Sequence, residues 1–118
     1  MAVLWVDYWK VRAPDRAAEG AAYINAIVPI AIRCGARPGN GHIYTQQFGA
    51  DGELANARFM VSTAFDNYAE MGAWIDKLLV DPEFRTWWAM QFKPDSPCEH
   101  VARTVLNEWA LPLQPPPG

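Results

Sequence analysis

The nine residues Val3–Val11 constrain the fold more than any other stretch, because they are apolar or aromatic on both of the faces that a β-strand presents. Side chains alternate between these faces, so Trp5, Asp7 and Trp9 share one of them. The opposite face, which includes Tyr8, is also largely apolar. A strand with one solvated face would alternate apolar with polar residues. We therefore predict a central strand that is covered on both sides.

The chain has 118 residues, which is the length of one domain. We assign residues 1–110 to this domain and expect the Pro-rich tail, residues 111–118, to be extended or disordered. The net charge of −3 and the scattered basic residues argue against nucleic-acid binding. The longest apolar run, residues 26–32, is far shorter than the ~20 residues of a membrane span. We expect a cytoplasmic protein without nucleic-acid or membrane partners.

The rest of the chain predicts two helical regions and three further strands. Their expected bounds are a helix from an Asp15 N-cap to about Cys34, strands at His42–Phe48 and Leu54–Phe65 joined by a hairpin at Gly49–Glu53, a helix from Asn67 to about Val80 that restarts at Asp81-Pro82, and a strand at Glu99–Trp109. Pro29 predicts a kink in the first helix, and Gly35 suits the left-handed residue that ends it.

This order, β-α-β-β-α-β, predicts an α+β domain of the ferredoxin-like type with a four-stranded antiparallel sheet. Right-handed crossovers place the first and third strands in the centre and both helices on one face. The other face also carries apolar residues, among them Met60 and Leu106. A second copy of the chain would bury that face, so we expect a homodimer.

Asp7 is the most informative residue, because a carboxylate between Trp5 and Trp9 in a central strand needs a partner to offset its desolvation. One interpretation is an ion pair with Arg103 from the neighbouring fourth strand. The other is a catalytic or ligand-contacting carboxylate. The sequence favours neither strongly, since buried ion pairs also occur without function.

Two histidines, His42 and His100, each open an edge strand. No spacing typical of a metal site is present, and we predict no metal. His42 is either a solvated residue or a general base near Tyr44 on the same face. Tyr23 either fills the core or points its hydroxyl into a cleft. The helical spacing of Trp74, Trp87 and Trp88 favours a role in the core or in an interface over a role in binding a cofactor. We interpret Cys34 and Cys98 as reduced structural thiols.

Three segments, Gly35–Arg37, Ala64–Ala69 and Lys77–Phe84, resemble the dimeric α+β barrel superfamily, in particular its small NIPSNAP-like and antibiotic-biosynthesis-monooxygenase-like members. The resemblance spans about residues 3 to 109. It implies two sheets that pair into a barrel and a ligand cleft between each sheet and its own helices. The superfamily includes cofactor-free oxygenases, isomerases, polyketide cyclases and haem enzymes, so the fold does not select a reaction.

The resemblance also bears on the site. Haem-using relatives take a histidine from the second helical region, and this sequence has none between Asp66 and Phe92. Asn, Trp, Tyr and Arg line the cleft of the cofactor-free oxygenases, and this sequence offers a match in residue type with Trp5, Tyr44, Arg103 and Asn107.

We therefore expect a small cofactor-independent enzyme, of the lyase, isomerase, cyclase or oxygenase type, acting by acid–base chemistry on an apolar, aromatic or polyketide-like molecule. The expected catalytic residues are Asp7, His42, Tyr44 and Arg103, and the expected substrate-binding residues are Trp5, Trp9, Tyr23, Asn107 and Trp74. The alternative is a homodimer that binds a small ligand without catalysis or has a structural role. A cleft filled by tryptophans, with no cavity of at least ~300 Å3, would favour that alternative.

Overall fold

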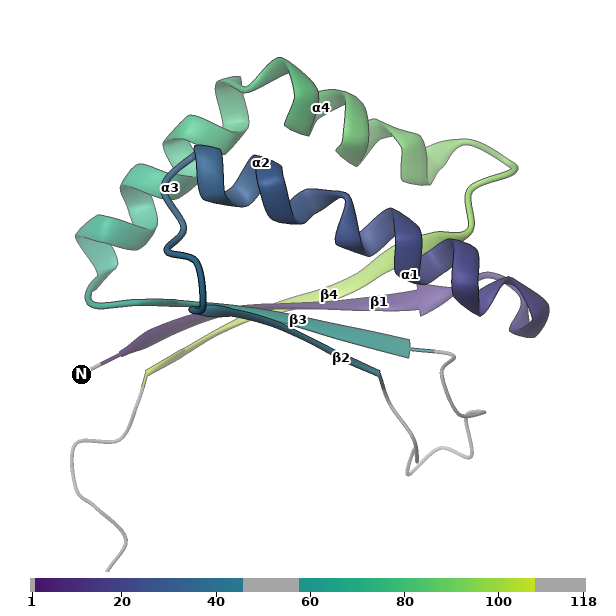
Figure 1. The fold of residues 1–118 in the computed structure, drawn as a ribbon, viewed down its shortest axis with the longest axis horizontal. Coiled ribbons are helices and arrows are strands. Elements are labelled where there is room, and N and C mark those ends of the chain that lie inside the picture. The colour runs from purple at the N-terminus through teal and green to yellow at the C-terminus, as the bar shows by residue number, and fades with distance from the viewer. Residues whose placement is uncertain (1, 46–57, 108–118) are drawn as a thin grey trace, which may run out of the picture.

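The computed structural model describes residues 2–45 and 58–107, which form a sheet covered by helices (Figure 1). The elements are β1 (Val3–Val11), a 3-10 turn (Pro14–Arg16), α1 (Ala17–Asn25), α2 (Ile27–Arg33), β2 (Gly41–Thr45), β3 (Arg58–Phe65), α3 (Tyr68–Val80), α4 (Pro82–Ala89), a second 3-10 turn (Met90–Phe92) and β4 (Cys98–Asn107). The predicted hairpin at Gly49–Glu53, the adjoining strand ends, Trp109 and the tail lie outside the described residues.

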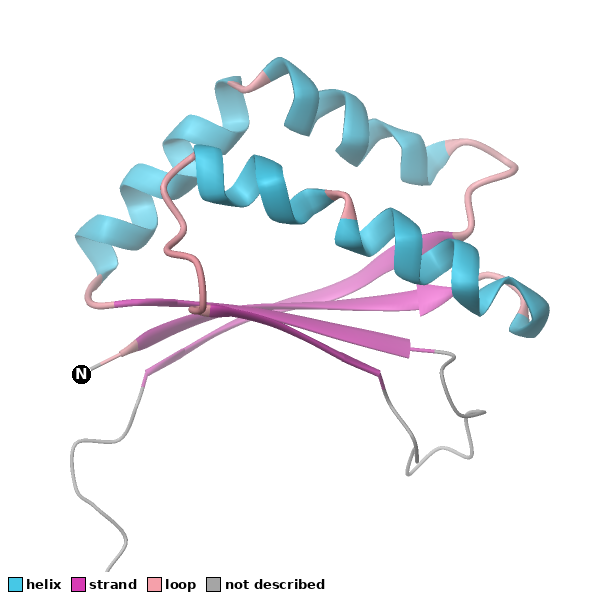
Figure 2. Ribbon diagram, in the orientation of Figure 1, coloured by secondary structure: helices cyan, strands magenta, loops and turns pink. Residues whose placement is uncertain are grey.

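The four strands form an antiparallel sheet in the order β2-β3-β1-β4, with all helices on one face (Figure 2). The predicted ferredoxin-like topology is confirmed, including the central position of the first and third strands. No helix in the described part of the chain is long and apolar enough to cross a membrane.

The first helical region departs from the prediction at its start and follows it at its centre. Asp15 was predicted to cap the helix, which is wrong: it lies within the 3-10 turn, and the residue before α1 makes no side-chain capping bond. The helix breaks at Ala26, because Pro29 has no N–H to donate to the carbonyl of Asn25, four residues earlier. Gly35, with φ of 120°, ends α2 as predicted.

The second helical region is capped as the sequence predicts. The Asn67 side chain accepts a hydrogen bond from the Glu70 N–H at 2.8 Å and begins α3. The Asp81 carboxylate accepts from the Phe84 N–H at 2.9 Å, and Pro82 is the first residue of α4. The break between α3 and α4 is therefore encoded locally, by a cap followed by a proline.

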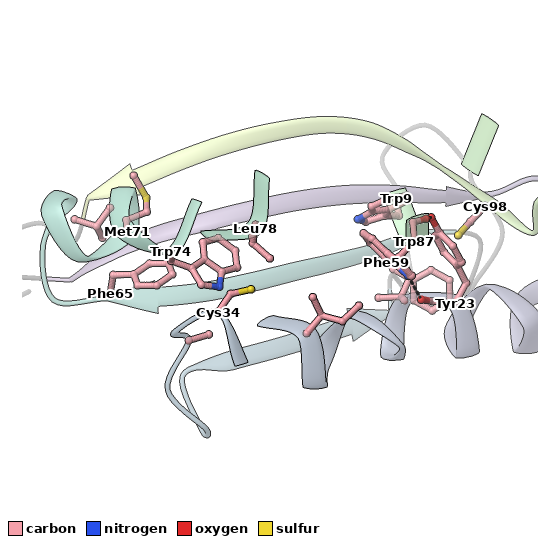
Figure 3. Packing of buried hydrophobic residues seen from close by; sticks show 14 of the residues in the cluster. Trp9, Tyr23, Cys34, Phe59, Phe65, Met71, Trp74, Leu78, Trp87 and Cys98 are labelled. Atoms are coloured by element: carbon pink, nitrogen blue, oxygen red, sulfur yellow. Dashed lines mark hydrogen bonds between the residues drawn. The ribbon is translucent and has the colours of Figure 1, made fainter. Parts of the chain in front are cut away.

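The core between helices and sheet is rich in aromatic rings, which gather in two groups (Figure 3). In one group Tyr23 stacks on Trp87 with ring centroids 4.8 Å apart, and Trp9 meets both rings edge-on. Trp74 and Phe65 belong to the other group, with centroids 5.0 Å apart. This arrangement leaves space between the helices and the middle of the sheet.

Candidate functional site

A cavity of about 410 Å3 lies between the helices and the sheet. Both aromatic groups border it, and Trp5, Asp7 and Trp9 of β1 form part of its wall. The predicted common face of these three residues is thus the face that points toward the helices. The remaining wall is mainly apolar and includes Trp74, Ile75, Leu78, Phe84, Trp87 and Trp88. The volume falls in the range typical of small-molecule sites, which is about 300–1,000 Å3.

Asp7 is the centre of a polar cluster at this wall. Its Oδ1 lies 2.7 Å from Nε of Arg103 and 2.8 Å from Nε2 of His100, and its Oδ2 accepts a hydrogen bond from Nε1 of Trp5 at 2.9 Å. The carboxylate is 16% exposed, so these donors replace much of its lost hydration. The predicted contact between Asp7 and Arg103 is confirmed.

A bulge in β4 brings His100 into the cluster. Tyr8 pairs with Ala102 and Trp9 pairs with His100, so Val101 is an extra residue without a partner on β1. In a regular strand without a bulge, His100 and Arg103, which are three residues apart, would face opposite sides of the sheet. Sequence reasoning missed His100, because strict alternation along β4 does not place it beside Asp7.

Aromatic rings and a glutamine hold His100 in position. Its ring centroid lies 5.1 Å from those of both Trp9 and Trp88. The backbone N–H of His100 donates to Oε1 of Gln91 at 3.0 Å, and Nε2 of Gln91 donates to the carbonyl of Trp88 at 3.2 Å. The buried Gln91 therefore ties the bulge to the end of α4.

Arg103 lies between the cavity and solvent. Its side chain is 38% exposed, and its guanidinium carbon lies 4.5 Å from the ring centroid of Trp5 and 5.5 Å from that of Trp88. Such cation–π contacts favour the cation and restrict its orientation. The arginine thereby supplies a fixed positive charge next to the Asp7 carboxylate.

Asp7 keeps some capacity to accept a further hydrogen bond. An ionised carboxylate has about four acceptor positions, and three donors among the described residues contact Asp7. Two of them share Oδ1, so the free position is on Oδ2. A molecule in the cavity would meet an acceptor and a cation side by side.

No protein-family model matches this sequence, and it has no significant similarity to a curated protein. Solved structures do resemble it. A NIPSNAP-like domain protein from Burkholderia xenovorans superimposes with a TM-score of 0.64 and 16% identity, over 98% of this chain and 92% of that one. A NIPSNAP family protein from Agrobacterium tumefaciens gives 0.62 and 14%, over 97% and 100% of the two chains.

A third similar structure is a variant of SnoaB, a cofactor-independent oxygenase from Streptomyces nogalater. Its TM-score is 0.58 at 15% identity, over 95% of this chain and 98% of that one. This chain shares the fold of these three proteins. The resemblance to the dimeric α+β barrel superfamily seen in the sequence is thus confirmed for the fold. Sequence identities of 14–16% do not show that the activity is shared.

The two predicted catalytic residues of β2 lie apart from Asp7. The His42 and Tyr44 rings share a face, with centroids 6.0 Å apart, as predicted. Ile43 between them packs on the core, so alternation places both rings on the outer face of the sheet. Position 42 borders the cavity, yet its ring does not join the Asp7 cluster.

Tyr23 and Asn107 also lie away from Asp7. The Tyr23 hydroxyl donates to the carbonyl of Trp87, and Nε1 of Trp87 donates to the carbonyl of Tyr23 at 2.8 Å. Burial raises the pKa of Tyr23 far above its ordinary value of 10.0. Of the two interpretations of Tyr23, the core residue is confirmed, and the hydroxyl pointing into the cleft, with the expected substrate contact, is wrong. Asn107 shares the face of Arg103 but accepts from the Tyr68 hydroxyl at 2.7 Å near the end of β4.

Trp74 borders the cavity as expected, and its Nε1 donates to the carbonyl of Ala31 at 3.1 Å. Residues 2–45 and 58–107 contain no cluster of His, Cys, Asp and Glu suited to a metal ion. The two cysteines are free and buried. Burial raises the pKa of Cys98 to about 12, which makes it a poor nucleophile at neutral pH.

Proposed function

We propose that this protein is a cofactor-independent enzyme that removes a proton from an apolar, aromatic or polyketide-like molecule held in the cavity. The observation that carries the proposal is the Asp7 carboxylate, which borders an apolar cavity with the Arg103 cation at its side. General bases need a position within hydrogen-bond reach of the proton that they take. The open acceptor position on Asp7 satisfies this requirement.

In the proposed step, Oδ2 of Asp7 takes a proton from a carbon next to a carbonyl group. The C–H electron pair moves into the new C=C bond, and the carbonyl oxygen becomes an enolate. Arg103 stabilises this developing negative charge. His100 and the Trp5 N–H hold the carboxylate in place while it accepts the proton. A positioned base of this kind typically accelerates a reaction by about 10²- to 10⁴-fold.

The similarity to a cofactor-independent oxygenase supports this proposal, because the same fold hosts an enzyme that needs no cofactor. His42, Tyr44, Tyr23 and Asn107 have no role in it, since their side chains lie outside the Asp7 cluster. His100 joins the site in their place.

Hydrogen–deuterium exchange tests the proposal without requiring the natural substrate. 2-Tetralone is a bicyclic aromatic ketone whose CH2 groups next to the carbonyl exchange in D2O, which NMR follows directly. The protein should speed this exchange, and Asp7→Asn should reduce the enzymatic rate by about 100-fold. Asp76→Asn, which alters an exposed aspartate of α3, is the matched control and should leave the rate unchanged. Equal rates in the Asp7→Asn variant and the wild type would contradict the proposal.

The second candidate is a non-catalytic binding protein for an apolar molecule. It is favoured by the three donors on Asp7, because they occupy three of the about four acceptor positions of the carboxylate. Under this alternative, 2-tetralone binds and changes tryptophan fluorescence, while its exchange rate equals that in buffer.

We also propose that the protein is a homodimer that pairs through the outer face of the sheet. Tyr8 on the central strand is 37% exposed on this face, and Tyr44 and Leu106 on the edge strands are exposed as well. An apolar sheet face of this kind typically marks an interface, and twofold pairing is its commonest form.

A further inference from the structure

We infer that the cavity selects aromatic molecules that carry a carboxylate group, which the terminal nitrogens of Arg103 bind. The inference rests on the proposed function in one respect, the location of the ligand beside Asp7. It goes further by naming the chemical group that distinguishes the ligand from other apolar molecules of similar size.

The hydrogen bonds of Arg103 leave its terminal nitrogens available. Its Nε donates to Oδ1 of Asp7 at 2.7 Å. Within residues 2–45 and 58–107, Nη1 and Nη2 have no hydrogen-bond acceptor. The guanidinium group has five N–H donors in a rigid plane, so four donors remain on its two terminal nitrogens.

The two tryptophans orient these donors before any ligand binds. The Trp5 and Trp88 ring centroids lie 4.5 and 5.5 Å from the guanidinium carbon, and both residues border the cavity together with Arg103. Rings packed against a guanidinium restrict its rotation, while hydrogen bonds form in its plane. A planar group with two oxygens side by side fits such a fork.

The charges around the cavity also favour Arg103 as the anion site. The cavity borders a second arginine, Arg37, but this residue already binds Asp66 at 2.9 Å and Glu70 at 3.2 Å. At Asp7, the negative charge is opposed by several donors, which lowers its repulsion of a second anion. Among the described residues, Arg37 is thus paired with two carboxylates and Arg103 with one, so the charge of Arg103 is less neutralised.

The apolar part of the cavity wall determines which chemical group carries the carboxylate of the ligand. Trp5, Trp74 and Trp88 offer large ring surfaces, and Ile75 and Leu78 add aliphatic ones. Flat aromatic bodies gain most from such surroundings, because they bury apolar area and stack on the rings. The ligand class that fits both parts of the cavity wall is an aromatic carboxylic acid.

Calorimetric titration with a matched pair of probes tests this inference. 2-Naphthoate and 2-naphthamide have the same rings and nearly the same shape, and they differ in charge. We expect 2-naphthoate to bind at least about tenfold more tightly, because charge-assisted bidentate hydrogen bonds are stronger than neutral ones. Arg103→Gln should abolish this preference, and Arg103→Lys, which keeps the charge without the fork, should retain part of it.

Arg85→Gln is the control, since it removes an exposed arginine of α4 that does not border the cavity. Equal affinity of the wild type for both probes, or a preference that survives in Arg103→Gln, would overturn the inference. Circular dichroism of each variant separates lost binding from lost folding. Arg103→Lys keeps the test decisive if Arg103→Gln does not fold.

The two proposals fail separately. 2-Tetralone has no carboxylate, so catalysed exchange without a preference for 2-naphthoate would refute the carboxylate inference alone. A clear preference for 2-naphthoate without catalysed exchange would refute the catalytic proposal alone, and would describe a binding protein for aromatic acids.

Discussion

His100 and Arg103 are three residues apart in β4, yet Nε2 of the one and Nε of the other lie 2.8 and 2.7 Å from the same oxygen of Asp7. Side chains three residues apart in a regular strand point to opposite faces. Because Val101 has no partner on β1, His100 and Arg103 pair with Trp9 and Asp7, which are only two residues apart. His100 therefore points toward the helices, as Arg103 does. At this spacing, the polar cluster therefore depends on a bulge in an edge strand.

Deleting Val101 should leave His100 beside Asp7. His100 and Arg103 are then two residues apart, and side chains at this spacing in a regular strand point to the same face. We expect 2-tetralone exchange, measured by NMR in D2O, to stay near the wild-type rate. Deleting both Val101 and Ala102 makes His100 and Arg103 neighbours on opposite faces, so Asp7 loses a partner and the exchange rate should fall strongly. A Val101 deletion variant that folds but loses exchange would show that the site needs the bulge itself and not only the shared face.

The fold could be predicted from local patterns. Asn67 and Asp81 mark helix starts with caps, Pro29 marks the break in the first helical region, and Gly35 marks its end. Each acts on its own neighbours, so its effect is visible in the sequence. The prediction for Asp15 was wrong because the residue type suits a helix cap, yet Asp15 lies inside a 3-10 turn.

The site was predictable where it depends on strand pairing, and less so where it depends on irregularity. The pair of Asp7 and Arg103 follows from the order of the strands. His100 required knowledge of a bulge, for which Val101 gives no recognisable signal. Tyr23 was uncertain because a tyrosine hydroxyl finds partners equally well in a cleft or in a core, and here it binds the backbone of Trp87.

Replacing Asp7 with alanine should lower the free energy of unfolding. The change leaves the partly buried donors of Trp5 and His100 without their acceptor, and each such loss costs about 1–3 kcal/mol, while the exposed Arg103 can bind water instead. Asp7→Asn keeps one carbonyl acceptor and should cost less. Urea denaturation at neutral pH measures both variants. An Asp7→Ala protein as stable as the wild type would mean that the cluster is maintained for function alone.

A charge on the outer face of the sheet should dissociate the proposed dimer. Light scattering of the wild type should give about twice the chain mass of 13.2 kDa. Tyr8→Glu places an acidic group at the centre of that face and should give a monomer. Val80→Glu introduces the same charge at an exposed position of α3, so it should leave the dimer intact. A monomeric wild type would refute the dimer directly.

The contact between Arg33 and Asp81 should make stability depend on pH in the acid range. The hydrogen bond from Arg33, followed by that from the Phe84 N–H, lowers the pKa of Asp81 below its ordinary value of 3.8. A carboxyl whose pKa is lower in the folded state stabilises the fold above its unfolded pKa, and this contribution is lost as the pH falls through the folded pKa. Asp81 should therefore contribute fully at neutral pH and progressively less below about pH 4.

Asp81→Asn tests this dependence, because asparagine still caps α4 but carries no charge. Its urea midpoint should lie below that of the wild type at pH 7, and the two midpoints should converge as the pH falls below about 4. Glu83, which lies 2.8 Å from Arg33, keeps part of the attraction in the variant. Asp76→Asn is the control, and its midpoint should follow that of the wild type at every pH. A constant difference between Asp81→Asn and the wild type across this range would show that the hydrogen bond of the cap, and not the charge, stabilises the junction of α3 and α4.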